Sequence, residues 1–257
     1  MSRRPVQFVC EGAALAGTLD EAHGTTGLLL VSGGNEIHSG SWAGQSQLAA
    51  RIAAAGYPVL RFDRRGIGDS EGENAGFGGQ DADIAAALVA FRSAQPQVQR
   101  VVGFGNCDAA SALMLSAAEL GFDALVLANP WIIEAGDESV QAPAALRRRY
   151  AQKVTDPGEW LRLLRGGVNL RKLVWGLRHA SGPAPRSSLA DAMQTGLAKF
   201  AGPVIILLAA RDRAAQLFEA AWPADDAHVC RIDSASHSFS DEVAREWLFE
   251  RIIESLS

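Results

Sequence analysis

The feature that most constrains the fold is an apolar strand that runs into an Ala-rich helix through a turn of small residues. Residues 102–112 read VGFGNCDAASA, and Cys107 lies at the apex of the turn. Such a turn brings the strand and helix backbones nearly into contact, so the positions two before and two after the apex must hold small residues. Gly105 and Ala109 occupy those positions. The segment therefore predicts a nucleophile elbow with cysteine where most such turns carry serine.

Cys107 differs in its surroundings from the other two cysteines of the chain. A helix that begins at Asp108 points its first N–H groups at the sulfur and favours the thiolate form. An isolated cysteine is more often a small buried hydrophobic residue, but the strand, turn and helix around Cys107 favour a nucleophile. Cys10 and Cys230 lie in strand-like alternating runs without neighbouring turn residues. We predict that both are packing residues.

Short apolar runs bounded by turn residues alternate with helical stretches along most of the chain. The runs that predict buried strands are residues 28–31, 58–62, 101–104, 124–128 and 203–208. The helical stretches are residues 43–55, 80–94, 108–120 and 214–221. Continuous apolar runs of this length are typical of parallel strands buried on both faces. The alternation predicts a doubly wound α/β sheet with right-handed crossovers, and the alternating residues 6–19 predict an antiparallel hairpin at its edge.

Residues 131–199 break this rhythm, because the stretch is long and contains no convincing strand. We expect one domain over residues 1–257, with residues 131–199 inserted in it as a helical lid. Residues 147–186 contain ten Lys or Arg and two acidic residues. This basic stretch has two interpretations: a surface that receives an anionic part of a substrate, or a solvated helical face that balances an acidic body.

The composition argues against several classes of protein. No apolar run approaches the roughly 18 residues needed to span a bilayer, and the first residues lead into a strand rather than a signal-peptide core. The net charge of −5 gives no overall attraction to nucleic acid. Three cysteines without a CxxC motif or a Cys/His cluster argue against a disulfide framework or structural zinc. We therefore expect a cytoplasmic protein that takes a small-molecule substrate and needs no cofactor or metal.

A nucleophilic cysteine needs a base, and the base needs a carboxylate that orients it. Asp212 follows the predicted strand at residues 203–208, and His237 lies in a turn-like segment before the final helix. Both lie on loops after predicted strands, at the edge where an open α/β sheet builds its site. The order nucleophile, acid, histidine is the one associated with the elbow. The sequence therefore predicts a Cys107–His237–Asp212 triad, with Asp241 as a less suitable alternative to Asp212 because it is placed to cap the last helix.

An acyl-transfer site also needs N–H donors for the developing oxyanion. Asp108 follows the nucleophile, and its N–H supplies the first donor. The Gly-Gly turn after the first buried strand supplies the second, from the backbone of Gly34 or Asn35. His38 follows the same turn, and we predict that it lines the substrate pocket.

Three segments of the chain together resemble a known family. The sequence RFDRRGIGDSEG at residues 61–72 resembles the RGxGxS loop of α/β-hydrolases. With it, GNCDAASA at residues 105–112 and NPW at residues 129–131 resemble the first of the two hydrolase families associated with exosortase A systems. The resemblance extends over nearly the whole chain and implies an α/β-hydrolase fold with a helical lid. It further implies a cytoplasmic bacterial enzyme, linked to exopolysaccharide production and C-terminal protein sorting, that uses the same triad.

The chain departs from the common hydrolase pattern by cysteine in place of serine and by Ala109 where glycine is usual. A thioester formed on Cys107 reacts slowly with water unless the site positions that water. Acyl transfer to another acceptor is therefore an alternative to hydrolysis of an ester or thioester. Asp108 raises a second question, because a carboxylate beside the sulfur opposes the thiolate form unless it points away and caps its own helix.

Two other functions fit the same sequence. A non-catalytic binding or scaffold protein can keep a hydrolase fold after losing its reaction. A dienelactone-type hydrolase, which opens cyclic esters through a cysteine, shares the triad and differs in the contents of its pocket.

Overall fold

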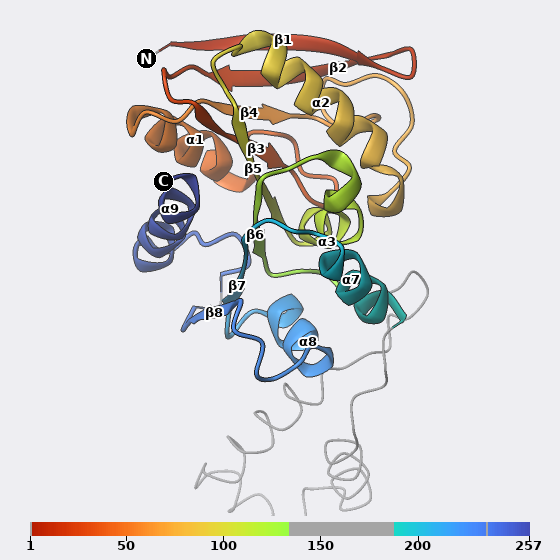
Figure 1. The fold of residues 1–257 in the computed structure, drawn as a ribbon, viewed down its shortest axis with the longest axis vertical. Coiled ribbons are helices and arrows are strands. Elements are labelled where there is room, and N and C mark those ends of the chain that lie inside the picture. Colours follow the sequence, from red (N-terminus) through yellow and green to blue (C-terminus); the bar gives the residue numbers. More distant parts are fainter. Residues whose placement is uncertain (1, 134–187, 235) are drawn as a thin grey trace, which may run out of the picture.

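The computed structural model describes residues 2–133, 188–234 and 236–257 (Figure 1). The strands in these residues are β1 (Arg3–Cys10), β2 (Ala13–Asp20), β3 (Thr26–Val31), β4 (Val59–Phe62), β5 (Arg100–Asn106), β6 (Ala124–Ala128), β7 (Val204–Ala209) and β8 (Val229–Ile232). They form one sheet with the order β1-β2-β4-β3-β5-β6-β7-β8. Strand β2 pairs antiparallel with β1 and with β4, and all other neighbours in the sheet are parallel. The predicted mostly parallel α/β sheet with an antiparallel hairpin at its edge is confirmed.

Helices cover both faces of the sheet and make three layers (Figure 1). The helices of the described residues are α1 (Gly44–Ala54), α2 (Asp81–Ala94), α3 (Asp108–Leu120), α7 (Ser188–Ala198), α8 (Arg213–Ala221) and α9 (Glu242–Leu256), with short 3-10 turns η1 (Ser41–Ala43) and η2 (Phe77–Gly79). Helices α1 and α9 pack on one face, whereas α2, α3, α7 and α8 pack on the other. In the part of the chain that is described, no helix has the length and apolar character needed to cross a membrane.

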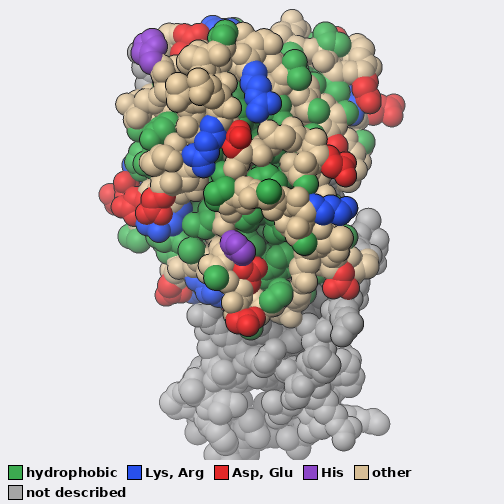
Figure 2. Space-filling model, in the orientation of Figure 1, with side chains coloured by type: hydrophobic (Ala, Val, Ile, Leu, Met, Phe, Trp, Pro, Cys, Tyr) green, Lys and Arg blue, Asp and Glu red, His purple; other side chains and the backbone are tan. Residues whose placement is uncertain are grey.

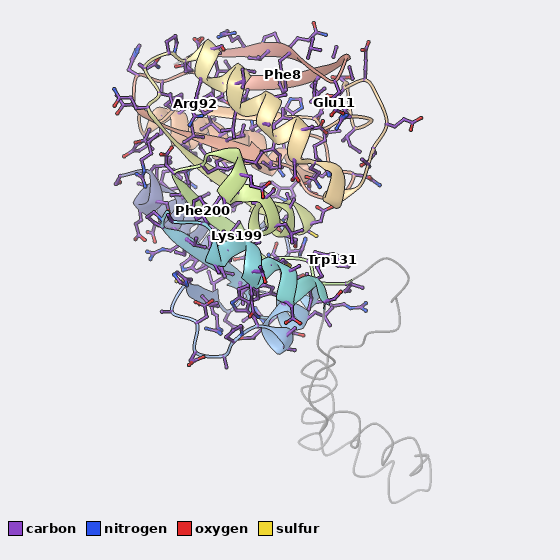
Figure 3. All side chains as sticks on the ribbon, turned by 45° about the vertical axis from the view of Figure 1, so that its right-hand side comes forward. Phe8, Glu11, Arg92, Trp131, Lys199 and Phe200 are labelled. Carbon is purple, nitrogen blue, oxygen red and sulfur yellow. The ribbon has the colours of Figure 1, made fainter. Side chains whose placement is uncertain are left out.

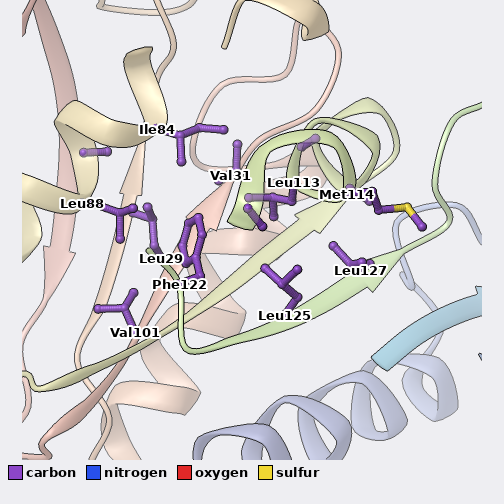
Figure 4. Packing of buried hydrophobic residues seen from close by; sticks show 14 of the residues in the cluster. Leu29, Val31, Ile84, Leu88, Val101, Leu113, Met114, Phe122, Leu125 and Leu127 are labelled. Carbon is purple, nitrogen blue, oxygen red and sulfur yellow. The ribbon is translucent and has the colours of Figure 1, made fainter. Parts of the chain in front are cut away.

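The central strands are buried from both sides, and every residue of β4 and β6 is buried. Successive side chains of a strand point to opposite faces. Leu29 and Val31 therefore pack with α2 and α3, whereas Leu28 and Leu30 pack with α1 and α9. Figure 4 shows Leu29 and Val31 beside side chains of the covering helices. A shift of strand register by one residue would move each side chain to the opposite face of the sheet. Burying one such leucine contributes about 1.5–3 kcal/mol, and these contributions hold the strands in register.

The predicted lid at residues 131–199 lies only partly in the described residues. Residues 134–187, which include the whole basic stretch, lie outside them. The last part forms α7, which packs on α3 as the helix that precedes β7. Met193 of α7 is completely buried, and a side chain at Gly196 would collide with the carbonyl oxygen of Met114. Residues 188–198 therefore belong to the helical layer that covers the sheet.

The turn between β5 and α3 has the close backbone approach that the small residues predict. A Cβ atom at Gly105 would lie 2.7 Å from both the carbonyl carbon of Ala109 and the nitrogen of Ala110. Cys107, at the apex, has φ 62° and ψ −128°, a conformation that costs a residue with a side chain on the order of 1–3 kcal/mol. The surrounding contacts have to hold it there.

We expect Gly105→Ala to destabilise the protein by about 1–3 kcal/mol, because the added methyl group meets the backbone of a packed helix. Gly78→Ala is the matched control, since a Cβ atom at Gly78 meets nothing within 4 Å. Urea unfolding of both variants measures the two free energies. Equal stabilities would mean that the elbow tolerates a side chain at position 105.

Candidate active site

Backbone hydrogen bonds on both sides of the turn hold Cys107 at the carboxyl edge of the sheet. Its N–H donates to the carbonyl oxygen of Ala128 at 3.0 Å, and its own carbonyl oxygen accepts from the N–H groups of Ser111 and Trp131, both at 3.3 Å. The Ser111 hydroxyl also donates to the Trp131 carbonyl oxygen at 2.6 Å. These hydrogen bonds tie the elbow to the segment after β6, and the side chain of Cys107 stays partly exposed. Figure 3 shows Trp131, in that segment, well apart from Glu11 in the turn of the β1–β2 hairpin.

The side chains of Asp212 and His237 reach the elbow from the ends of neighbouring strands. Asp212 follows β7, and His237 lies between β8 and α9. His237 Nδ1 lies 3.0 Å from Asp212 Oδ2, and the imidazole lies close enough to the side chain of Cys107 for the two groups to interact. Asp212 accepts the N–H of Ala215 at 3.1 Å as the cap of α8, which holds the carboxylate in place. The structure thus brings the three side chains of the predicted triad together.

His237 carries a positive charge at neutral pH. Its hydrogen bond with Asp212, and after it the one with Cys107, raises the pKa of His237 from 6.5 to about 10. Burial by itself raises the pKa of Asp212, but the hydrogen bond and the charge of His237 outweigh burial and hold that pKa below its usual value.

Asp241, the alternative partner for His237, has other contacts. Its side chain accepts the N–H of Ala244 at 2.8 Å and the hydroxyl of Ser234 at 2.7 Å. Asp241 is the N-cap of α9, as its position before the last helix suggested. The carboxylate that contacts His237 is that of Asp212.

Two asparagines position the loop that carries His237, and reasoning from the sequence did not assign them a role. Asn129 Nδ2 donates to the carbonyl oxygen of His237 at 3.0 Å, and Asn106 Nδ2 donates to the same oxygen at 3.2 Å. Asn129 is completely buried, has φ 42°, and accepts the N–H of Ala209 at 2.9 Å. It therefore joins the ends of β6 and β7 to the histidine loop. The available signal was a polar residue directly after a buried strand.

The loop after β3 passes directly over the elbow. A Cβ atom at Gly33 would collide with the carbonyl oxygen of Asn106 and would lie 3.3 Å from Cys107 Cβ. The absence of a side chain at Gly33 therefore allows the loop to approach Cys107 closely. The backbone of the Gly-Gly turn lies beside the elbow, as its predicted role as an oxyanion donor requires.

The two candidate donors from this loop differ in their contacts. The N–H of Gly34 donates to Asp108 Oδ1. The side chain of Asp108, the first residue of α3, thus reaches the glycine loop. The Asn35 side chain contacts another loop, where its Oδ1 accepts from Asn74 Nδ2 at 3.0 Å. Gly34 is therefore the residue of this pair whose N–H lies beside the first residue of α3.

His38 lies in a network of its own. Its Nε2 lies 2.9 Å from Thr18 Oγ1, and its Nδ1 lies 2.9 Å from Asp63 Oδ2. The backbone N–H of His38 also donates to Asp63 Oδ1 at 2.6 Å. Both ring nitrogens thus lie close to polar groups of the protein, and the side chain is 18% exposed. These contacts join the loop after β3 to the loop after β4, and a contact of His38 with substrate stays a prediction.

A cavity of about 310 Å³ lies between α1 and α9. Its lining includes Asn106 and Ser238, the chain neighbours of Cys107 and His237, but no triad side chain. Its apolar walls are formed by Trp42, Leu48, Phe104, Phe239 and Leu248. The cavity therefore lies beside the predicted triad and does not include its side chains.

We expect Asn129→Ala to lower the free energy of unfolding by about 1–3 kcal/mol, because it leaves the buried N–H of Ala209 without its partner and removes one of the two donors to the His237 carbonyl oxygen. Asn35→Ala is the control, since Asn35 is exposed and its side chain contacts another exposed residue. Urea unfolding compares the two variants. An equal loss in both would contradict the anchoring role of Asn129.

The free energy of unfolding should fall as the pH rises toward 10. The pKa of His237 in the fold, about 10, lies above its ordinary value of 6.5, so the charged ring contributes its full stabilisation below pH 6.5 and loses it as the pH passes about 10. His237→Gln removes this contribution and flattens the pH dependence. Urea unfolding of both proteins between about pH 6 and pH 10 tests this, and parallel curves would exclude His237 as the source.

Comparisons with known proteins agree with this architecture. The structure of an esterase from Pyrococcus furiosus is similar, with a TM-score of 0.62, 17% identity, and coverage of 99% of this chain and 90% of that one. The α/β hydrolase GrgF from Penicillium sp. sh18 has a TM-score of 0.65 and 16% identity, with coverage of 100% and 98%. Est1E from Butyrivibrio proteoclasticus, solved with ferulic acid bound, has a TM-score of 0.58 and 17% identity, with coverage of 97% and 98%.

At these identities the three structures show a shared fold. No protein among the curated sequences matches the chain. The model of the alpha/beta hydrolase family matches residues 23–251, which is most of the sequence. The chain therefore belongs to the alpha/beta hydrolase family.

Proposed function

We propose that the protein is a cysteine-nucleophile hydrolase or acyltransferase that acts on an ester or thioester of a small or medium acyl group. The observation that carries the proposal is the line of contacts from Asp212 through His237 to Cys107 at the apex of a strained turn. A nucleophile, a base and an orienting carboxylate in this order meet the requirements of acyl transfer. Membership of the hydrolase family supports the class of reaction.

In the proposed reaction, the Cys107 thiolate attacks the carbonyl carbon and forms a tetrahedral intermediate. His237 then donates its proton to the leaving alcohol or thiol, and the bond to that group breaks to leave a thioester on Cys107. The imidazole, now neutral, takes a proton from water or another acceptor, which attacks the thioester and releases the acyl group. Asp212 keeps the ring oriented and offsets its positive charge throughout.

The negative charge on the carbonyl oxygen requires preorganised donors. In the proposal, the N–H of Asp108 at the start of α3 is the first donor, and the helix dipole adds a positive potential there. The N–H of Gly34 is the second, because the loop over the elbow holds it beside α3. The backbone N–H of Asn35 is the alternative second donor.

Features of the sequence indicate which substrates among the esters and thioesters the protein uses. A link to exopolysaccharide production and exosortase systems is part of the proposal and rests on the resemblance carried by residues 105–112 and 129–131. An anionic part of the substrate is supported by the ten basic residues at 147–186, all of which lie outside the described residues. On the face shown in Figure 2, acidic and basic side chains of the described residues are interspersed around a central group of hydrophobic ones.

The first experiment is intact-protein mass measurement after brief incubation with activated esters, thioesters and lactones. We expect an acyl adduct on the wild type and none on Cys107→Ala, because the thioester forms on that sulfur. The panel member that reacts also separates a lactone hydrolase from an enzyme for linear esters. Cys10 does not compete for the reagents, because burial, and to a smaller extent the nearby Asp83, raises the pKa of its thiol to about 11.

Two further variants make the result specific to the triad. His237→Ala should slow adduct formation by about a hundredfold or more, as expected for loss of a positioned acid–base group. Cys230→Ala is the matched cysteine control and should react like the wild type. No adduct and no product with any panel member would instead favour the non-catalytic binding protein.

A further inference from the structure

The carboxylate of Asp108 occupies the place that the proposed reaction needs for the substrate's carbonyl oxygen. Asp108 Oδ1 accepts the hydrogen bond of the Gly34 N–H. The same oxygen would lie 2.7 Å from a Cβ atom at Gly33, whose other near neighbours are the carbonyl oxygen of Asn106 and Cβ of Cys107. The carboxylate therefore lies in the narrow space between the glycine loop and the elbow. A substrate oxygen reaches this N–H only after the carboxylate has left it.

A buried arginine beside the same loop offers the carboxylate a second partner. Arg64 is 2% exposed, and its Nη2 donates to the carbonyl oxygen of Gly34. Its Nε and Nη1 are also buried and have no hydrogen-bond partner among the described residues. A buried donor without a partner is costly, so a carboxylate that reaches these nitrogens is stabilised there.

Two carboxylates act on Arg64 through their charge, and only one of them is free to move toward it. Asp108 attracts Arg64 more strongly than Asp83 does. Asp83 is already paired with Arg65, whose Nε lies 2.5 Å from Asp83 Oδ1. The unmet N–H groups of Arg64 therefore fit the carboxylate of Asp108.

We propose that Asp108 is a positioning residue that occupies the second oxyanion donor in the resting protein and moves to Arg64 when the substrate's carbonyl oxygen replaces it. The inference rests on the proposed function, because it requires an oxyanion to form at the Gly34 N–H. Arg64 keeps its bond to the Gly34 carbonyl oxygen, which holds the peptide between Gly34 and Asn35, directly after the peptide that carries the Gly34 N–H. The Gly34 N–H thus binds the Asp108 carboxylate first and the substrate oxyanion afterwards, as negative charge develops on the substrate.

The position of the Asp108 carboxylate also restricts the charge of the acyl group that the site accepts. A carboxylate beside the reacting carbonyl repels a negative charge on the adjacent atoms of the substrate. The acyl group next to the carbonyl is therefore neutral, and any anionic part of the substrate lies farther from the sulfur.

The test measures the rate constant of Cys107 acylation by p-nitrophenyl butyrate at saturating concentration, from the burst of p-nitrophenolate. Asp108→Ala frees the Gly34 N–H and should raise this rate constant by about tenfold. Asp108→Asn should raise it less, because the amide oxygen still accepts a weaker, neutral hydrogen bond. Glu119→Ala removes an exposed carboxylate from the other end of α3 and should leave the rate unchanged. Thermal unfolding verifies that each variant is folded, and Asp108→Asn carries the test if Asp108→Ala does not fold.

The outcomes separate this inference from the proposed function. Acylation of the wild type with an equal or lower rate in folded Asp108→Ala would overturn the inference and leave the cysteine mechanism intact. Acylation of Asp108→Ala alone would support both. No acylation of Cys107 in either protein would reject the proposed function and the inference with it.

A double-mutant cycle tests the role of Arg64. Arg64→Lys removes the planar donors, so it should slow acylation by about tenfold when Asp108 is present. In the Asp108→Ala background the same substitution should have a much smaller effect on the rate, because no carboxylate remains that Arg64 could bind. A purely structural role of Arg64 predicts equal effects in both backgrounds, and equal effects would overturn its assignment as the second partner.

Discussion

The site depends on the close approach of three pieces of backbone at the end of β5. Gly105 lets the start of α3 pack against the strand, and Gly33 lets the loop after β3 lie over Asn106. Without Cβ atoms between them, a sulfur, a helix terminus and a loop N–H share one small volume. The strained conformation of Cys107 is part of the same arrangement, and its bonds to the segment after β6 hold it against the cost of that strain.

Opposite charges lie on two sides of the Cys107 sulfur: the ring of His237 on one side and the carboxylate of Asp108 on the other. On one side, Asp212 binds His237 and stabilises the charged form of the ring. On the other, Asp108 binds the backbone N–H of Gly34 and lies near the buried charge of Arg64. The two carboxylates thus have different roles because one meets a titratable ring and the other meets fixed donors. The negative charge of the Asp108 carboxylate beside Cys107 is thereby met by a backbone N–H and by a nearby cation.

The elements of the fold could be predicted closely, because their signals are local. The helix expected at residues 108–120 and the strand expected at residues 124–128 have those bounds in the structure. The order of Cys107, Asp212 and His237 along the chain was also sufficient to select the three side chains that the structure brings together. Asn129 was different, since a polar residue after a strand is common. Its importance appears only when the ends of β6 and β7 meet the histidine loop.

The sequence by itself determined the strands, the helices and the elbow, because hydrophobic periodicity and small residues act between positions a few residues apart. The tertiary structure decided which polar groups meet. Asn129 binds the carbonyl oxygen of a residue 108 positions later, and the carboxylate of Asp108 binds an N–H 74 positions earlier. These pairs follow from strand order, which places β3 beside β5 and β6 beside β7. Burial of apolar faces selects that order, and the polar partners at the strand ends are a consequence of it that no local pattern encodes.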